Sequence, residues 1–127
     1  MTRILLIDDD LLARDMLRQM LERAGYEVVD AANGREGLQH YQATAIDLII
    51  TDILMPDKDG LETILELRRL APEAKIIAIS GGGQSGLLDL LPVAEKLGAQ
   101  WTLRKPLRRL ELLEAIRQLV PYQDGTL

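Results

Sequence analysis

Three consecutive carboxylates, Asp8, Asp9 and Asp10, directly follow a short apolar run at residues 3–7. Two carboxylates about 4 Å apart repel each other by roughly 4 kcal/mol at an effective dielectric constant near 20, so the cluster costs stability unless a cation or a helix end compensates it. Asp10 immediately precedes a helical pattern and is predicted to be the N-cap of that helix. Asp8 and Asp9 are then left to bind a metal ion.

Polar side chains also mark the ends of three other apolar runs. They are Asp52 after residues 47–51, Ser80 after residues 75–79, and Arg104 and Lys105 at the end of residues 101–104. Mg²⁺ takes hard oxygen ligands and few of them, together with water and phosphoryl oxygens. With such an ion bound, Asp52 can act as a nucleophile toward phosphorus, while Lys105 offsets charge and Ser80 donates to a phosphoryl oxygen. Singly, Asp52 could end a strand and Ser80 could form a turn, but their combination favours Mg²⁺-dependent phosphoryl chemistry.

The elements that must position these residues are buried strands that alternate with amphipathic helices. Apolar runs without strict alternation predict strands covered on both faces, as in a parallel sheet. The predicted strands span residues 3–7, 27–31, 47–51, 75–79 and 101–104. The pattern predicts a doubly wound α/β domain, in which ligands bind beyond the carboxyl ends of the strands.

Two apolar rows predict helices that each bury one face. The first row is Leu12, Met16 and Met20, and the second is Leu107, Leu110, Leu113, Ile116 and Leu119. Gly25 is predicted to end the first helix. Capping-box spacing is present at Asn33 with Glu36 and at Asp59 with Glu62, and it predicts the starts of two further helices.

Length and composition limit the classes of function. A chain of 127 residues with 47% hydrophobic residues can bury one core, so we expect a single domain over residues 1–121 and a frayed C-terminal tail over residues 122–127. A formal net charge of −5 argues against nucleic acid or an anionic membrane as a direct partner. Cysteine is absent, as is an apolar stretch of about 20 residues, so a cytoplasmic protein is expected.

Two other functions are compatible with part of the pattern. Asp8 and Asp10 form an acid-x-acid pair after a strand, as in Mg²⁺-dependent aspartate-nucleophile phosphatases of the haloacid dehalogenase type. That family usually continues with glycine and threonine, whereas this chain has Leu11 and Leu12. A flavin-binding module would need a phosphate loop rich in hydrogen-bond donors, where three carboxylates would repel the cofactor phosphate.

From about Arg3 to Val120 the chain resembles the receiver domain of two-component response regulators. The resemblance rests on "LLIDDD", "LIITDILMPDKDGLE", the strand-ending Ser80 and "LRKP", which occur in the expected order. It implies a flavodoxin-like (βα)5 fold with strand order 2-1-3-4-5. It also implies a cis peptide bond between Lys105 and Pro106.

The resemblance further implies roles for individual residues. Asp52 would be the phosphoacceptor, and Lys105 and Ser80 would contact the phosphoryl group. Asp9, Asp52 and the Leu54 carbonyl would bind Mg²⁺, with Asp8 acting mainly through water. The phosphoryl donor would be a histidine kinase or a phosphotransfer protein, and the output would be a downstream protein target. On this basis the chain is not expected to be an enzyme beyond its own phosphorylation and dephosphorylation.

The chain departs from the usual receiver pattern near its C-terminal half. Thr102, with Trp101 beside it, stands where receivers usually carry an aromatic residue three positions before the lysine, and Leu107 replaces a frequent phenylalanine. Since Pro92 disfavours helix at Leu91, residues 84–91 are predicted to be irregular. At least one leucine of this stretch is predicted to be exposed and to mediate a dimer or target contact on phosphorylation: Leu87, Leu88, Leu90 or Leu91.

Overall fold

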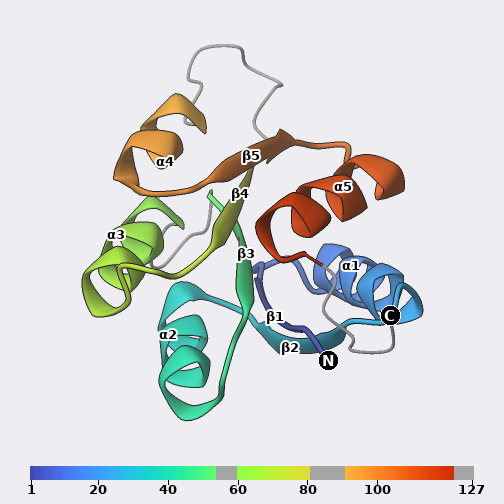
Figure 1. Cartoon of the computed structure of the whole chain (residues 1–127), viewed down its shortest axis with the longest axis horizontal. Helices are drawn as coiled ribbons and strands as arrows, with labels where there is room; N and C mark the ends of the chain where they lie inside the picture. Colours follow the sequence, from blue (N-terminus) through green and yellow to red (C-terminus); the bar gives the residue numbers. More distant parts are fainter. Residues whose placement is uncertain (54–59, 81–90, 122–127) are drawn as a thin grey trace.

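A five-stranded parallel sheet with helices on both faces forms the protein (Figure 1). The computed structural model describes residues 1–53, 60–80 and 91–121. The strands are β1 (Arg3–Ile7), β2 (Glu27–Ala31), β3 (Leu48–Asp52), β4 (Ile76–Ser80) and β5 (Trp101–Arg104). The helices are α1 (Leu11–Arg23), α2 (Gly34–Ala43), α3 (Gly60–Leu70), α4 (Leu91–Leu97) and α5 (Arg109–Leu119). The strand order is β2-β1-β3-β4-β5, which confirms the predicted doubly wound, flavodoxin-like fold.

The core consists of two apolar layers, one on each face of the sheet. On one face the sheet packs against α2, α3 and α4, and on the other against α1 and α5 (Figure 1). Successive residues of β1 alternate between the layers, with Leu5 and Ile7 in the first and Ile4 and Leu6 in the second. The central strands are therefore covered on both faces, which is why their sequences are continuously apolar.

Three of the five predicted strands agree with the observed ones, and the other two are shifted by one residue. The strands at residues 3–7, 27–31 and 101–104 are as predicted, whereas β3 and β4 each begin and end one residue later than predicted. Asp52 and Ser80 are consequently the last residues of their strands. Ladder pairing extends to them, since Asp52 pairs with Ile79 and Ser80 with Arg104.

The buried face predicted for the first helix is wrong in most of its residues. Leu12 is 70% exposed and Met16 is 63% exposed, whereas the buried residues of α1 are Leu17 and Leu21. Residues four apart are rotated by about 40° around a helix of 3.6 residues per turn, so a row of them leaves the core-facing side. Only Met20, at the end of the row, packs partly against the core.

The apolar row predicted for the last helix is also only partly buried. Residues three apart, like residues four apart, do not lie at the same angle around a helix of 3.6 residues per turn. Leu113 and Ile116 are buried, as predicted, but Leu110 is 71% exposed. Leu107 and Leu119 are partly buried against the core. The face of α5 that packs on the sheet also includes Leu112 and Ala115.

The boundaries of the first helix follow the predicted signals. Asp10 is the N-cap of α1, and its Oδ1 accepts hydrogen bonds from the amides of Leu12 at 3.0 Å and Ala13 at 3.3 Å. Gly25 follows the helix with a φ of 98°, a conformation that favours glycine. The Asp10 carboxylate is therefore engaged by the helix terminus.

The predicted start of the second helix is confirmed with Asn33 as its N-cap, but the reciprocal bond of Glu36 goes to the residue before the cap. Asn33 Oδ1 accepts a hydrogen bond from the Glu36 amide at 2.9 Å, and Glu36 Oε1 accepts one from the Ala32 amide at 2.9 Å. Asp59, the first residue of the second predicted box, lies outside the described residues.

The prediction that residues 84–91 are irregular is wrong for Leu91. This residue begins α4 and is buried against the core. Pro92 lies in the first turn of α4, where the amide of a helical residue has no intrahelical partner and proline is tolerated. Leu87, Leu88 and Leu90 lie outside the described residues.

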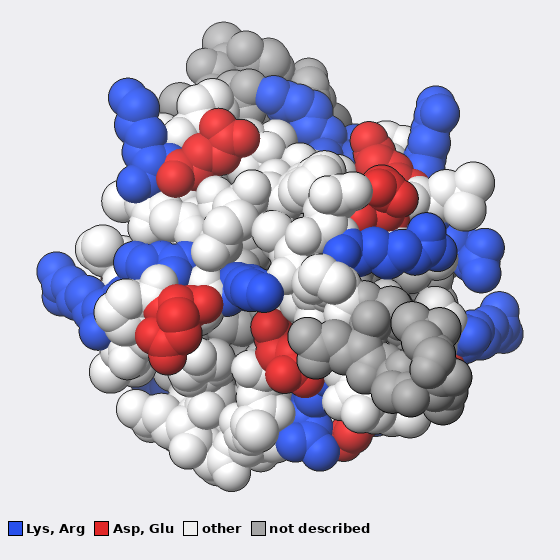
Figure 2. Space-filling view, in the orientation of Figure 1, with Lys and Arg blue, Asp and Glu red and all other residues white. Residues whose placement is uncertain are grey.

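The surface carries charges of both signs. On the face that Figure 2 shows, basic and acidic side chains are interspersed rather than gathered by sign. In the described part of the chain, none of the helices has both the length and the apolar character that a membrane span requires.

Candidate functional site

Three carboxylates converge at the carboxyl ends of two neighbouring strands. β1 pairs with β3 so that Ile7 lies opposite Thr51, and Asp8 and Asp52 each come one residue beyond this pair. Ligand oxygens of Asp8, Asp9 and Asp52 all lie within 4.8 Å of one another. Asp8 and Asp52 are buried, and Asp9 is exposed. The fold thus brings the predicted acidic residues together at the carboxyl ends of the strands.

Lys105 supplies positive charge to this cluster. Its Nζ donates a hydrogen bond to Asp52 Oδ2 at 2.9 Å and lies 3.7 Å from Asp8 Oδ2. The Lys105 amide donates to the Ser80 carbonyl at 2.9 Å, which ties the residue to the end of β4. The peptide bond between Lys105 and Pro106 is cis, as the resemblance implied. The lysine therefore faces both buried carboxylates.

The acidic cluster carries more negative charge than the single lysine beside it can balance. Burial, the largest influence, raises the pKa of Asp8, and the charges of Asp52 and Asp9 raise it further, against the lowering effects of the Asp10 amide and Lys105. Burial, the largest single influence, lowers the pKa of Lys105, but its hydrogen bond to Asp52 and the charges of Asp52, Asp8 and Asp10 together raise the pKa overall. One lysine thus faces several carboxylates whose oxygens are hard ligands. The donor set is compatible with a metal ion.

Ser80 lies at the same edge of the sheet. It is the buried last residue of β4, the strand that lies between β3 with Asp52 and β5 with Arg104. The strand ends therefore bring Ser80 to the region of the acidic cluster, as predicted. The Leu54 carbonyl, the remaining predicted ligand, lies outside the described residues.

Gly60 borders the site and was missed by sequence reasoning. It begins α3, and its amide donates a hydrogen bond to the Ile53 carbonyl at 2.7 Å. A Cβ atom at this position would lie 2.2 Å from the Asp52 carbonyl oxygen and 2.5 Å from Ile53 Cα. The available signal was a residue of poor helix propensity at the start of a helical pattern. Gly60 allows α3 to approach the backbone that carries Asp52.

Thr102, which stands where receivers usually carry an aromatic residue, and its neighbour Trp101 have different environments. Thr102 Oγ1 donates a hydrogen bond to Glu95 Oε2 on α4 at 3.2 Å. Trp101 is partly buried in the apolar layer beneath α1 and α5. The adjacent residues therefore contact opposite sides of the sheet, and it is Thr102 that connects β5 to α4.

Comparisons with known proteins agree with this geometry. The family model of the response regulator receiver domain matches residues 4–117. The chain is 36% identical over 118 residues to chemotaxis protein CheY of Thermotoga maritima, covering 92% of this chain and 96% of that protein.

Solved structures show the same similarity. A response regulator receiver domain protein from Clostridium thermocellum matches with a TM-score of 0.86 and 31% identity, covering 94% of each chain. The response regulator protein TrrA from Thermotoga maritima, solved in complex with Mg(2+)-BeF, matches with a TM-score of 0.81 and 33% identity, covering 94% of this chain and 100% of that one. The chain belongs to the family of response regulator receiver domains, the phosphoacceptor modules of two-component signalling.

Proposed function

We propose that Asp52 is the residue that accepts the phosphoryl group, in a reaction that requires Mg²⁺. The observation that supports this assignment is the contact of 2.9 Å between Lys105 Nζ and Asp52 Oδ2, at a point where the oxygens of Asp8 and Asp9 also converge. The donor is a phosphohistidine of a kinase or a phosphotransfer protein. It must approach from the side on which Asp9 is exposed.

The chemistry assigned to Asp52 is nucleophilic displacement at phosphorus. A carboxylate oxygen of Asp52 forms a bond to phosphorus as the phosphorus–nitrogen bond of the donor breaks, and the electron pair stays on the imidazole that leaves. Lys105 balances negative charge on the transferred group, and Ser80 donates a hydrogen bond to one of its oxygens. Attack of water on phosphorus later returns the free carboxylate and inorganic phosphate. We propose that the activity of the chain itself is limited to these two reactions.

The metal site proposed for this reaction uses oxygen ligands only. Asp9 and Asp52 bind Mg²⁺ directly, with the Leu54 carbonyl assigned by the family resemblance, and Asp8 binds through water. The ion would neutralise charge on the transferring phosphoryl oxygens.

The first experiment follows the intact mass of the protein during incubation with acetyl phosphate. We expect a single phosphoryl adduct in the presence of Mg²⁺ and none when a chelator is present. Parallel incubation with a generic phosphomonoester tests for phosphatase turnover, which we expect to be absent. An adduct that forms equally well in chelator would contradict the metal requirement, and sustained turnover would favour the phosphatase alternative.

Asp9→Ala is expected to weaken Mg²⁺ binding by at least about 100-fold, because changes to outer-shell residues already cost about 10- to 100-fold. The metal-free variant should be as stable as the wild-type protein or slightly more stable, since one of the repelling carboxylates is gone. Calorimetric titration with Mg²⁺ measures the first effect, and urea unfolding in chelator measures the second. Unchanged affinity would remove Asp9 from the proposed ligand set.

We further propose that phosphorylation changes how the segment that follows Ser80 binds a protein partner or a second copy of the chain. The described part of that region supports this proposal, since Thr102 of β5 is hydrogen-bonded to Glu95 of α4. Hydrogen exchange over residues 80–98, with and without the phosphoryl mimic beryllofluoride, tests the coupling. Identical exchange and identical self-association in both states would contradict it.

A further inference from the structure

The backbone beside the acidic cluster is held by an arginine that the reaction does not use. Arg14, the fourth residue of α1, donates from Nη1 to the Asp8 carbonyl oxygen at 2.7 Å and from Nε to Asp30 Oδ2 at 3.3 Å. The Arg14 side chain is only 14% exposed. One guanidinium therefore connects the end of β1 to β2 and α1.

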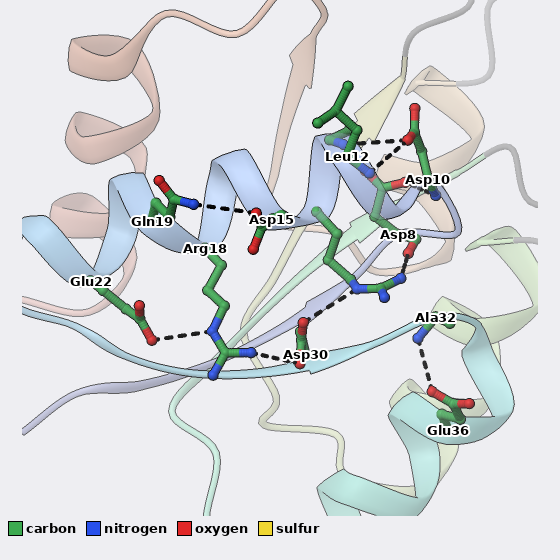
Figure 3. Close-up of polar contacts among 12 residues, drawn as sticks. Asp8, Asp10, Leu12, Asp15, Arg18, Gln19, Glu22, Asp30, Ala32 and Glu36 are labelled. Atoms are coloured by element: carbon green, nitrogen blue, oxygen red, sulfur yellow. Dashed lines mark hydrogen bonds and ion pairs between the residues drawn. The ribbon is translucent and has the colours of Figure 1, made fainter.

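A second arginine, Arg18, also contacts Asp30 but not the Asp8 carbonyl that Arg14 contacts. Arg18 Nη1 donates to Asp30 Oδ1 at 3.0 Å, so the two oxygens of Asp30 bind two different guanidiniums (Figure 3). Arg18 also pairs with Glu22 at 3.2 Å, whereas the hydrogen bond to the Asp8 carbonyl comes from Arg14. Asp30 therefore orients the Arg14 guanidinium through one oxygen, while Arg18 binds the other oxygen.

These contacts restrain the peptide that carries Asp9. The Asp8 amide donates to the Ala31 carbonyl at 3.1 Å, and Asp8 Oδ1 accepts a hydrogen bond from the Asp10 amide at 2.9 Å. The bond from Arg14 to the Asp8 carbonyl fixes the plane of the peptide between Asp8 and Asp9, because that peptide is rigid. Asp9 itself is exposed and lies between β1 and α1. The direction of its side chain therefore depends on this plane.

At the acidic cluster, Arg14 contacts a backbone carbonyl and leaves the carboxylate oxygens of the cluster accessible to a cation. An arginine paired with Asp9 or Asp52 would occupy oxygens that a cation needs. The carboxylate partner of Arg14 is instead Asp30 on β2, and its partner at the acidic cluster is the Asp8 carbonyl oxygen. Arg14 can consequently support the cluster without competing for its oxygens.

We propose that Arg14, oriented by Asp30, is a positioning residue that fixes the peptide between Asp8 and Asp9 so that both carboxylates face the metal ion. This inference rests on the proposed function, in which the cluster binds Mg²⁺. Arg14 touches neither the ion nor the phosphoryl group in this role.

The test compares Arg14→Ala with Arg18→Ala, a matched change four residues away that also removes an ion pair with Asp30. We expect Arg14→Ala to weaken Mg²⁺ binding, measured by calorimetry, by about tenfold, as is typical of residues that orient metal ligands. Arg18→Ala is expected to stay within about twofold of the wild-type affinity, since it leaves the bond to the Asp8 carbonyl in place. Should Arg14→Ala fail to fold, Asp30→Asn replaces it and is expected to weaken binding in the same direction.

A second readout does not depend on the metal. In chelator, the nuclear magnetic resonance signal of the Asp9 amide is expected to shift in Arg14→Ala and to stay in place in Arg18→Ala, because that amide shares a peptide with the Asp8 carbonyl. Equal Mg²⁺ affinities in the two variants, or an Asp9 amide that does not respond to Arg14→Ala, would overturn the inference alone. A wild-type protein that binds no Mg²⁺ would overturn the proposed function and this inference with it.

Discussion

The Asp52→Asn protein is expected to acquire no phosphoryl group from acetyl phosphate, under conditions in which the wild-type protein is phosphorylated. Asparagine has nearly the same shape as aspartate but lacks the anionic oxygen that attacks phosphorus. Its amide also loses the charge interaction with Lys105, whose Nζ lies 2.9 Å from Asp52 Oδ2. Intact mass after incubation with Mg²⁺ and acetyl phosphate measures the result.

The matched control is Asp15→Asn, which removes one exposed carboxylate from α1 at a distance from the cluster. We expect this variant to be phosphorylated like the wild-type protein. Circular dichroism establishes that both variants are folded. Persistence of the adduct in Asp52→Asn would assign the phosphoacceptor to another side chain and would contradict the proposed role of Asp52.

Gly60→Ala is expected to lower the free energy of unfolding by about 3 kcal/mol, the upper part of the range for added atoms in a packed interior. The new Cβ would lie 2.2 Å from the Asp52 carbonyl oxygen and 2.5 Å from Ile53 Cα. Backbone atoms of a central strand cannot rotate away as a side chain can, so α3 must shift. Since the same backbone carries Asp52, phosphorylation by acetyl phosphate should also slow. Urea unfolding in chelator measures the stability.

Gly37→Ala provides the comparison within the same chain. A Cβ at Gly37 of α2 would meet Cδ1 of Ile7 at 2.4 Å, and this atom is the end of a side chain. Ile7 can respond by changing rotamer, and alanine has a better helix propensity than glycine. We therefore expect a smaller loss of stability than in Gly60→Ala and normal phosphorylation. Equal losses in both variants would contradict the importance of the backbone contact at Gly60.

Local sequence patterns determined the elements and most of their ends. Continuous apolar runs specified the strands because a strand covered on both faces has no polar side, and β1, β2 and β5 have their predicted limits. Asp10 and Asn33 were identified as caps because a side-chain oxygen satisfies amides within the next few residues. Such signals act over a few residues and are visible in one stretch of sequence.

The buried faces of the helices were less accessible to sequence reasoning. Leu12, Met16 and Leu110 are apolar and fall in plausible rows, yet all three are exposed. Which side of a helix is buried depends on how the helix lies on the sheet, and apolar residues on the outer side cost little in a folded protein. Packing against the sheet chose Leu17 and Leu21 in α1 instead.

For the candidate site, the sequence by itself determined which polar residues end the strands, and a parallel sheet requires those ends to share one edge. Tertiary structure alone decided the distances: Lys105 Nζ reaches Asp52 Oδ2 at 2.9 Å because β4 lies between β3 and β5 and holds the Lys105 amide. It also decided the supporting contacts, in which Gly60 meets the Asp52 backbone and Arg14 meets the Asp8 carbonyl. These contacts join segments that are close only after the sheet and helices have packed, and no short-range pattern of residue types specifies them.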